Sequence, residues 1–147
     1  MSWDAITMRF GDAKTIDDLP ADFNPPPVAD AGTLKATLRG LFPDAEHHDE
    51  RSFLEDNNYW LELSYGCHTD DSGNVSAVGV RSNAGKRAIS HLRKLCDALH
   101  SRMLDIQTSE FADFSDETEN SMQSFSQLRD RALSAYNDES QDGRTKP

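Results

Sequence analysis

The densest group of side chains able to bind a metal ion is the run His47-His48-Asp49-Glu50. Neighbouring residues cannot all turn toward one ion, and no further pair at helical spacing completes the ligand set of a zinc site. Isolated runs of charge are usually solvated surface. We therefore predict a polar loop here, with no metal site and no cofactor.

Two further motifs contain residue types used in catalysis or anion binding. Cys67-His68 pairs a thiol with an imidazole, but an exposed hairpin loop offers little desolvation to tune the pKa of a nucleophilic thiol.

Gly85-Lys86-Arg87 contains the Gly-Lys step of a phosphate-binding loop, without the upstream glycine or the Ser or Thr that the motif requires. We expect ordinary helix initiation there and predict that the chain is not an enzyme.

Trp60 is the residue best suited to binding another protein. Residues 59–65 alternate, which predicts a strand with Tyr59, Leu61, Leu63 and Tyr65 inward and with Trp60 and Glu62 outward. A Trp ringed by carboxylates is typical of a binding hot spot. The same side chain would equally pack beneath a C-terminal helix or a proline-rich connection, and both interpretations stay open. The candidate partner-binding residues are Asp56, Tyr59, Trp60, Glu62, Asp70 and Asp71.

The net charge of the chain limits the kinds of molecule that it is expected to bind. The formal net charge is −11 and the isoelectric point is about 4.7. Such a surface repels phosphate backbones and anionic lipid, so we exclude nucleic acid and membranes as partners and favour a basic protein. The charge is also uneven: residues 44–74 hold nine acids and one base, whereas residues 81–102 hold six bases and one acid. The sequence thus predicts a dipolar molecule with an acidic hairpin region.

Length and composition fit one domain of 147 residues. No apolar run approaches the roughly 20 residues that span a bilayer. The start of the chain, Met1-Ser2-Trp3-Asp4, has no basic cluster followed by an apolar segment, so we expect no secretory signal. Two cysteines are too few for a disulfide scaffold, and we expect Cys96 to be a small core residue. These features favour a cytoplasmic protein.

Hydrophobic periodicity predicts the elements that position these residues. We expect strands over residues 5–10, 53–54, 59–65, 75–80 and 104–108, and a long Pro- and Asp-rich connection over 11–32. One helix would be capped by Thr33 and stopped by Pro43. The stripe of the second helix is Ile89, Leu92, Cys96, Leu99 and Met103.

The order of these elements predicts an α+β fold. It matches a ferredoxin-like split β-α-β-β-α-β arrangement, with an antiparallel sheet of four or five strands and the helices on one face. A C-terminal helix is expected over residues 121–136. Residues 1–136 would form the single domain, and residues 137–147 a disordered polar tail, because that tail has no apolar side chain to dock.

Several short segments resemble a family of bacterial proteins. They are the opening four residues, Leu19-Pro20-Ala21-Asp22-Phe23 before the proline run, Leu41-Phe42-Pro43, and the stretch from Leu104 to Phe111. Together they resemble small acidic proteins of the toxin-immunity type, found at contact-dependent or type VI secretion loci, over about residues 1–130. The resemblance implies a cytosolic protein that neutralises a cognate toxin by stoichiometric binding. The polar tail and the residues 47–51 depart from it.

Two hypotheses of different class follow. The first is an immunity protein or inhibitor whose carboxylates cover the active site of a basic toxin domain. The alternative is a small ferredoxin-like ligand-binding or regulatory module that dimerises through its sheet. The oligomeric state stays open, and a deep pocket with a stable homodimer would favour the second hypothesis.

Overall fold

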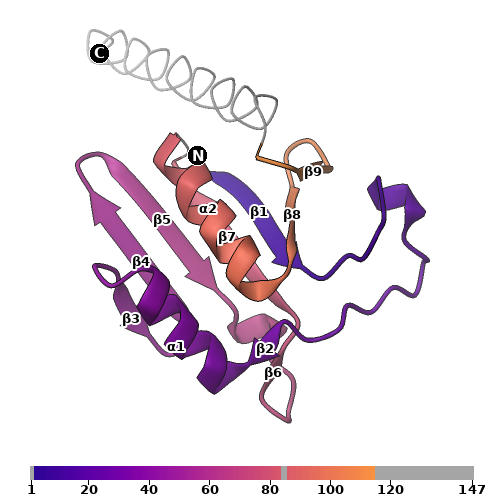
Figure 1. Cartoon of the computed structure of the whole chain (residues 1–147), viewed down its shortest axis with the longest axis horizontal. Helices are drawn as coiled ribbons and strands as arrows, with labels where there is room; N and C mark the ends of the chain where they lie inside the picture. Colours follow the sequence, from indigo (N-terminus) through magenta and orange to yellow (C-terminus); the bar gives the residue numbers. More distant parts are fainter. Residues whose placement is uncertain (1, 84–85, 115–147) are drawn as a thin grey trace, which may run out of the picture.

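Among the residues that the structure describes, seven antiparallel strands form one sheet, and two helices lie over one of its faces (Figure 1). The computed structural model describes residues 2–83 and 86–114. The strand order is β3-β4-β5-β7-β1-β8-β9. In chain order these strands are β1 (Trp3–Met8), β3 (Glu46–His48), β4 (Arg51–Asp56), β5 (Tyr59–Ser64), β7 (Ala77–Ser82), β8 (Arg102–Asp105) and β9 (Glu110–Ala112).

The remaining elements complete a mixed α+β structure, the class that the sequence predicts. Within the described residues, the α-helices are α1 (Ala31–Leu41) and α2 (Lys86–Leu99). A two-stranded sheet joins β2 (Ala29–Asp30) to β6 (Asn74–Val75), and two short 3-10 helices are η1 (Ile16–Asp18) and η2 (Gly66–His68).

The sheet is larger than predicted, and the ferredoxin-like split order is not confirmed. The additional strands are β3, where the sequence predicts a polar loop, and β9, where the sequence predicts no strand. Each is three residues long and lies at an edge of the sheet. Neither has the alternation of apolar and polar residues that identifies a strand in a sequence. Such short edge strands are stabilised by hydrogen bonds to one neighbouring strand, so they need no buried apolar face.

The alternation along each strand defines two unlike faces. On the face that carries the helices, Trp3, Leu61, Leu63, Val78 and Val80 are buried in the core. On the other face, which we call the open face, the side chains of β1 and β5 are only half-buried. Tyr59, Leu61, Leu63 and Tyr65 are all buried, which confirms their predicted inward direction.

The structure moves two predicted boundaries near the N-terminus. Strand β1 covers Trp3–Met8 instead of residues 5–10, because Trp3, Ala5 and Thr7 form its buried face. Helix α1 is capped by Asp30 instead of Thr33, since Asp30 Oδ1 accepts the N–H of Thr33 at 2.9 Å and Oδ2 accepts its hydroxyl at 2.7 Å. These hydrogen bonds from Thr33 hold the pKa of Asp30 below its ordinary value.

Helix α2 buries most of the predicted stripe. Leu92, Cys96 and Leu99 are buried, as is Leu95 between them. The helix ends at Leu99 because His100 takes a left-handed backbone conformation with φ of 49°. Met103 therefore belongs to β8 instead of the helix, although it too is fully buried.

The long connection between β1 and β2 covers one end of the open face. Phe10 packs edge-on to Phe111 with ring centroids 4.9 Å apart, and it stacks on Phe23 at 6.1 Å. Arg102 lies 4.1 Å above the Phe111 ring and donates to the carbonyls of Gly11 and Ala13. This small cluster fixes the connection against β8 and β9 and leaves the β3–β5 end of the open face uncovered by it.

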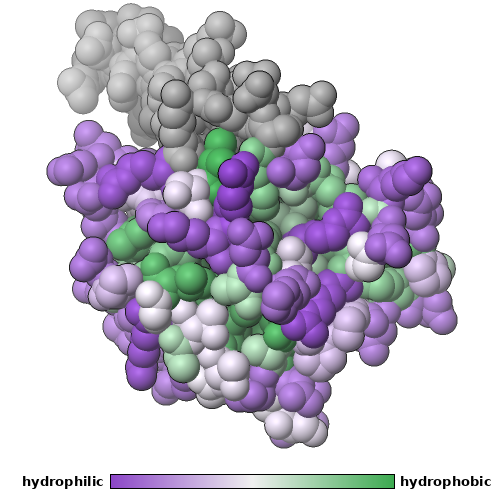
Figure 2. All heavy atoms as spheres, viewed as in Figure 1, coloured by the Kyte–Doolittle hydropathy of each residue, from purple (hydrophilic) through white to green (hydrophobic). Residues whose placement is uncertain are grey.

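Charged and polar side chains dominate the face that carries the helices, with small apolar patches between them (Figure 2). No helix of the described residues is long and apolar enough to cross a membrane. The predicted helix over residues 121–136 and the tail over 137–147 lie outside the described residues.

Candidate functional site

The structure distributes the six predicted partner-binding residues over three places. Trp60 and Glu62 lie on the open face, where Trp60 opposes Glu55 and Glu62 opposes Phe53. Asp56 and Tyr59 oppose each other on the side that carries the helices. Asp70 and Asp71 lie in the turn before β6, beyond the opposite end of β5. Only Trp60 and Glu62 are thus brought together on one exposed surface.

Tyr59 is part of the core beside α2. Its ring is buried, its hydroxyl lies 3.0 Å from His91 Nδ1, and the Arg87 guanidinium lies 5.1 Å from its ring centroid. Burial raises the pKa of Tyr59, so the phenol stays protonated and donates to His91. Asp56 accepts from Arg87 at 2.7 Å. These two residues therefore attach the β4–β5 hairpin to α2.

His91 is held in its neutral form by its surroundings. Burial and the nearby cations Lys94 and Arg87 lower its pKa. Its ring packs edge-on to Phe42, with the centroids 5.4 Å apart. The neutral imidazole accepts the Tyr59 hydroxyl at Nδ1, a bond that protonation of this nitrogen would abolish.

We predict that this contact makes stability fall in mild acid. Because the pKa of His91 is lower in the folded than in the unfolded state, the unfolded chain binds the extra proton more readily. The free energy of unfolding should therefore fall as pH drops below about 6.5, the unperturbed His pKa. Urea titrations across this range should show a smaller fall for His91→Gln. His100→Gln, a change at an exposed histidine, is the control and should retain the wild-type pH dependence.

Asp70 has a local structural role. Its Oδ1 accepts the N–H groups of Ser72 and Asn74, both at 2.9 Å. Gly73 completes the turn with φ of 83°, a conformation that favours glycine. Asp71 is exposed in the same turn. Asp70 therefore shapes the turn instead of contributing to the surface around Trp60.

The next residues are those of the His47-His48-Asp49-Glu50 run and the two cysteines, whose side-chain types are used in metal binding or catalysis. His47 uses both ring nitrogens, with Nδ1 at 2.8 Å from Ser52 Oγ and Nε2 at 2.9 Å from the Phe42 carbonyl, so it connects the end of α1 to the sheet. Cys67 is exposed, whereas Cys96 is buried, as predicted. Among residues 2–83 and 86–114, no three His, Cys, Asp or Glu side chains are grouped so as to hold a metal ion.

Aromatic and acidic side chains alternate across β3, β4 and β5 on the open face. Phe53 and Trp60 stack with ring centroids 6.4 Å apart and an interplanar angle of 25°. In the register of the sheet, Phe53 lies between Glu46 and Glu62, and Glu55 lies opposite Trp60. We call this group the acidic aromatic surface; its residues are Glu46, Phe53, Glu55, Trp60 and Glu62.

Three of these residues were not among the sequence candidates. Glu46, Phe53 and Glu55 belong to strands that the sequence shows only weakly. The sequence feature that could have identified them is the Asn57-Asn58 pair, which forms a two-residue turn with positive φ at both residues. Such a turn fixes the hairpin register and thereby sets Phe53 and Glu55 beside the face of Trp60.

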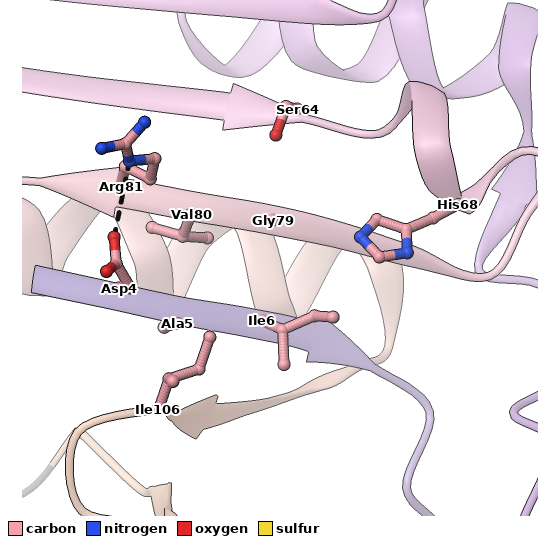
Figure 3. Close-up of a pocket in the computed structure, with 9 residues that line it drawn as sticks. All are labelled: Asp4, Ala5, Ile6, Ser64, His68, Gly79, Val80, Arg81 and Ile106. Atoms are coloured by element: carbon pink, nitrogen blue, oxygen red, sulfur yellow. Dashed lines mark ion pairs between the residues drawn. The ribbon is translucent and has the colours of Figure 1, made fainter.

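A second feature of the open face is a shallow pocket of about 480 Å³ at the centre of the sheet (Figure 3). The hollow forms where two small residues, Ser64 of β5 and Gly79 of β7, lie opposite each other in the sheet. Ile6 and Ile106 form its apolar side, and Ile106 is 52% exposed. Arg81, which pairs with Asp4 at 3.5 Å, lies at the opposite end from the His68 ring.

Comparisons with protein-family models, curated proteins and solved structures yield no match.

Proposed function

We propose that this chain is an inhibitor of the immunity type, which neutralises a basic toxin domain in the cytosol by stoichiometric binding. The observation that carries the proposal is the acidic aromatic surface. Two stacked aromatic rings lie among three carboxylates on a sheet face that no described helix covers.

The chemistry of this surface suits cationic side chains. A Lys or Arg positioned over an indole or phenyl face is attracted by the ring quadrupole, and the adjacent carboxylates add charge-assisted hydrogen bonds. Trp is also among the residues that contribute most binding energy at protein interfaces. The surface therefore combines an apolar anchor with selectivity for positive charge.

The charge of the whole chain supports the same class of partner. A protein of net charge −11 attracts a basic protein at long range and raises the association rate. This steering depends on salt, since the Debye length is about 10 Å at 0.1 M ionic strength.

The test compares the wild-type chain with a variant in which Glu46, Glu55 and Glu62 are replaced by Gln. Basic proteins that bind the immobilised wild-type chain are purified, and their association kinetics are measured at low and high salt. We expect the association rate constant to fall with salt, and to fall about tenfold in the triple variant. An equimolar amount of the chain should abolish the toxic activity of the captured protein.

A matched control changes the same net charge elsewhere. Replacing Asp12, Asp17 and Asp22 by Asn neutralises three exposed carboxylates on the long connection. If this control slows association as much as the first variant does, net charge alone attracts the partner and the acidic aromatic surface is not the interface. Binding without loss of toxic activity would contradict inhibition.

The central pocket favours a second candidate, a ligand-binding or regulatory module that dimerises through its sheet. The row of residues Glu62, Arg81 and Asp4 alternates in charge next to the apolar Ile6 and Ile106. Two copies of such a face have complementary charges. Because each copy has a net charge of −11, salt should strengthen a homodimer, whereas it should weaken a complex with a basic partner. Light scattering at two salt concentrations separates the two candidates.

A further inference from the structure

Strand β4 is longer than the strand that pairs with its outer edge. β3 pairs only with Arg51, Ser52 and Phe53. Among the described residues, the outer edge from Leu54 to Asp56 has no strand partner. Such an edge presents main-chain groups to which an extended segment can add.

The hydrogen bonds of the hairpin show which groups point outward. Trp60 gives its N–H to Asn83 Oδ1 at 3.0 Å, on the side away from β4. Trp60 and its partner Glu55 are therefore a non-hydrogen-bonded pair of the antiparallel ladder. It follows that the N–H and C=O of Glu55 point to the outer edge, as those of Arg51 and Phe53 do where they meet β3.

Two pockets flank this edge, one on each face of the sheet. The first, of about 300 Å³, is on the open face and is lined by Asp44, Glu46, Phe53 and Glu55. The second, of about 410 Å³, extends to the face that carries the helices and is lined by Asp44, Leu54, Glu55, Asp56, Arg87 and His91. Successive side chains of a strand point to opposite faces, so one added segment would place neighbouring side chains in the two pockets.

We propose that the outer edge of β4 at Glu55 is a docking site for an extended basic segment of the partner protein. This inference rests on the proposed function and names the recognition element. The segment exchanges two main-chain hydrogen bonds with Glu55, which is the β-augmentation mode of peptide recognition.

The pockets specify the side chains of that segment. The residue opposite Glu55 shares the open face and enters the pocket with three carboxylates and the Phe53 ring, which suits Arg or Lys. Its neighbour enters the second pocket, where Asp56 is already paired with Arg87. A short polar side chain such as Thr suits that position.

Charge favours a basic partner over a second copy of this chain. Pairing two copies through this edge would bring Glu55 of one copy against the acidic edge of the other, and like charges on an edge oppose such pairing. A basic segment has the opposite sign.

The test uses the full chain and the peptide acetyl-Lys-Thr-Arg-Thr-Lys-amide as the probe. Amide chemical shifts of residues 54–56 report its dissociation constant. A methyl group on the amide nitrogen of the peptide Arg removes the donor to Glu55, and we expect binding to weaken about tenfold. A methyl group on the amide of the following Thr, which points away from β4, is the matched control and should change binding by less than about twofold.

A protein variant completes the test. Glu55→Gln should weaken binding of the unmethylated peptide, whereas Glu110→Gln, at the opposite edge strand β9, should not. Equal effects of the two methyl groups, or no shift at residues 54–56, would overturn the docking site. In that case, a peptide affinity that still falls with added salt and in the triple Gln variant would leave the proposed function standing without a docking site at the β4 edge. A peptide affinity that changes neither with salt nor in the triple Gln variant would contradict the proposed function as well.

Discussion

Leu92→Ala should lower the free energy of unfolding by about 2–5 kcal/mol, the range for large-to-small changes in a close-packed core. Leu92 has no exposed surface and belongs to the cluster that joins α2 to the sheet, together with Trp3, Leu63 and Val80. Removing its isobutyl group leaves a cavity that the surrounding strands fill only in part. Urea titration of the variant measures the loss.

The control for this prediction is Ser90→Ala, a change at an exposed position of the same helix. Surface substitutions of this kind usually move stability by less than about 0.5 kcal/mol. If Leu92→Ala were as mild as Ser90→Ala, α2 would present a different face to the sheet from the one described.

Trp60→Ala should weaken binding of the basic partner by about 2–4 kcal/mol, the range of an interface hot spot. The indole is half-buried and stacks on Phe53, so it offers a rigid apolar surface with little conformational entropy to lose. We expect most of the effect in the dissociation rate, because a short-range contact does not alter the long-range charge that steers association. Surface plasmon resonance with the captured partner separates the two rates.

Ile106→Ala is the matched variant for this measurement. Ile106 is an exposed apolar residue on the same face, beside the central pocket. If Ile106→Ala speeds dissociation and Trp60→Ala does not, the interface is the central pocket instead of the acidic aromatic surface. Thermal melts of both variants exclude an effect through unfolding.

The sequence by itself determined the elements with strong periodicity. The alternation of residues 59–65 and the helical stripe through Leu92, Cys96 and Leu99 predicted buried faces that the structure confirms. These patterns are readable because each residue's burial depends on its own place in a regular repeat. The mixed α+β class follows from the same repeats.

The acidity of the chain and the outward direction of Trp60 were also predictable. They indicate a surface that suits a basic partner, but they leave open which residues surround the indole.

Only the tertiary structure decided the rest of the candidate site. Strand β3 has a polar sequence and three residues, and its pairing with β4 brings Glu46 beside Phe53. The same packing turned Asp56 and Tyr59 toward α2, where Arg87 and His91 bind them, and separated Asp70 from Trp60 by the length of β5. The physical reason is that cross-strand register and pairing between distant segments depend on contacts that no local repeat encodes.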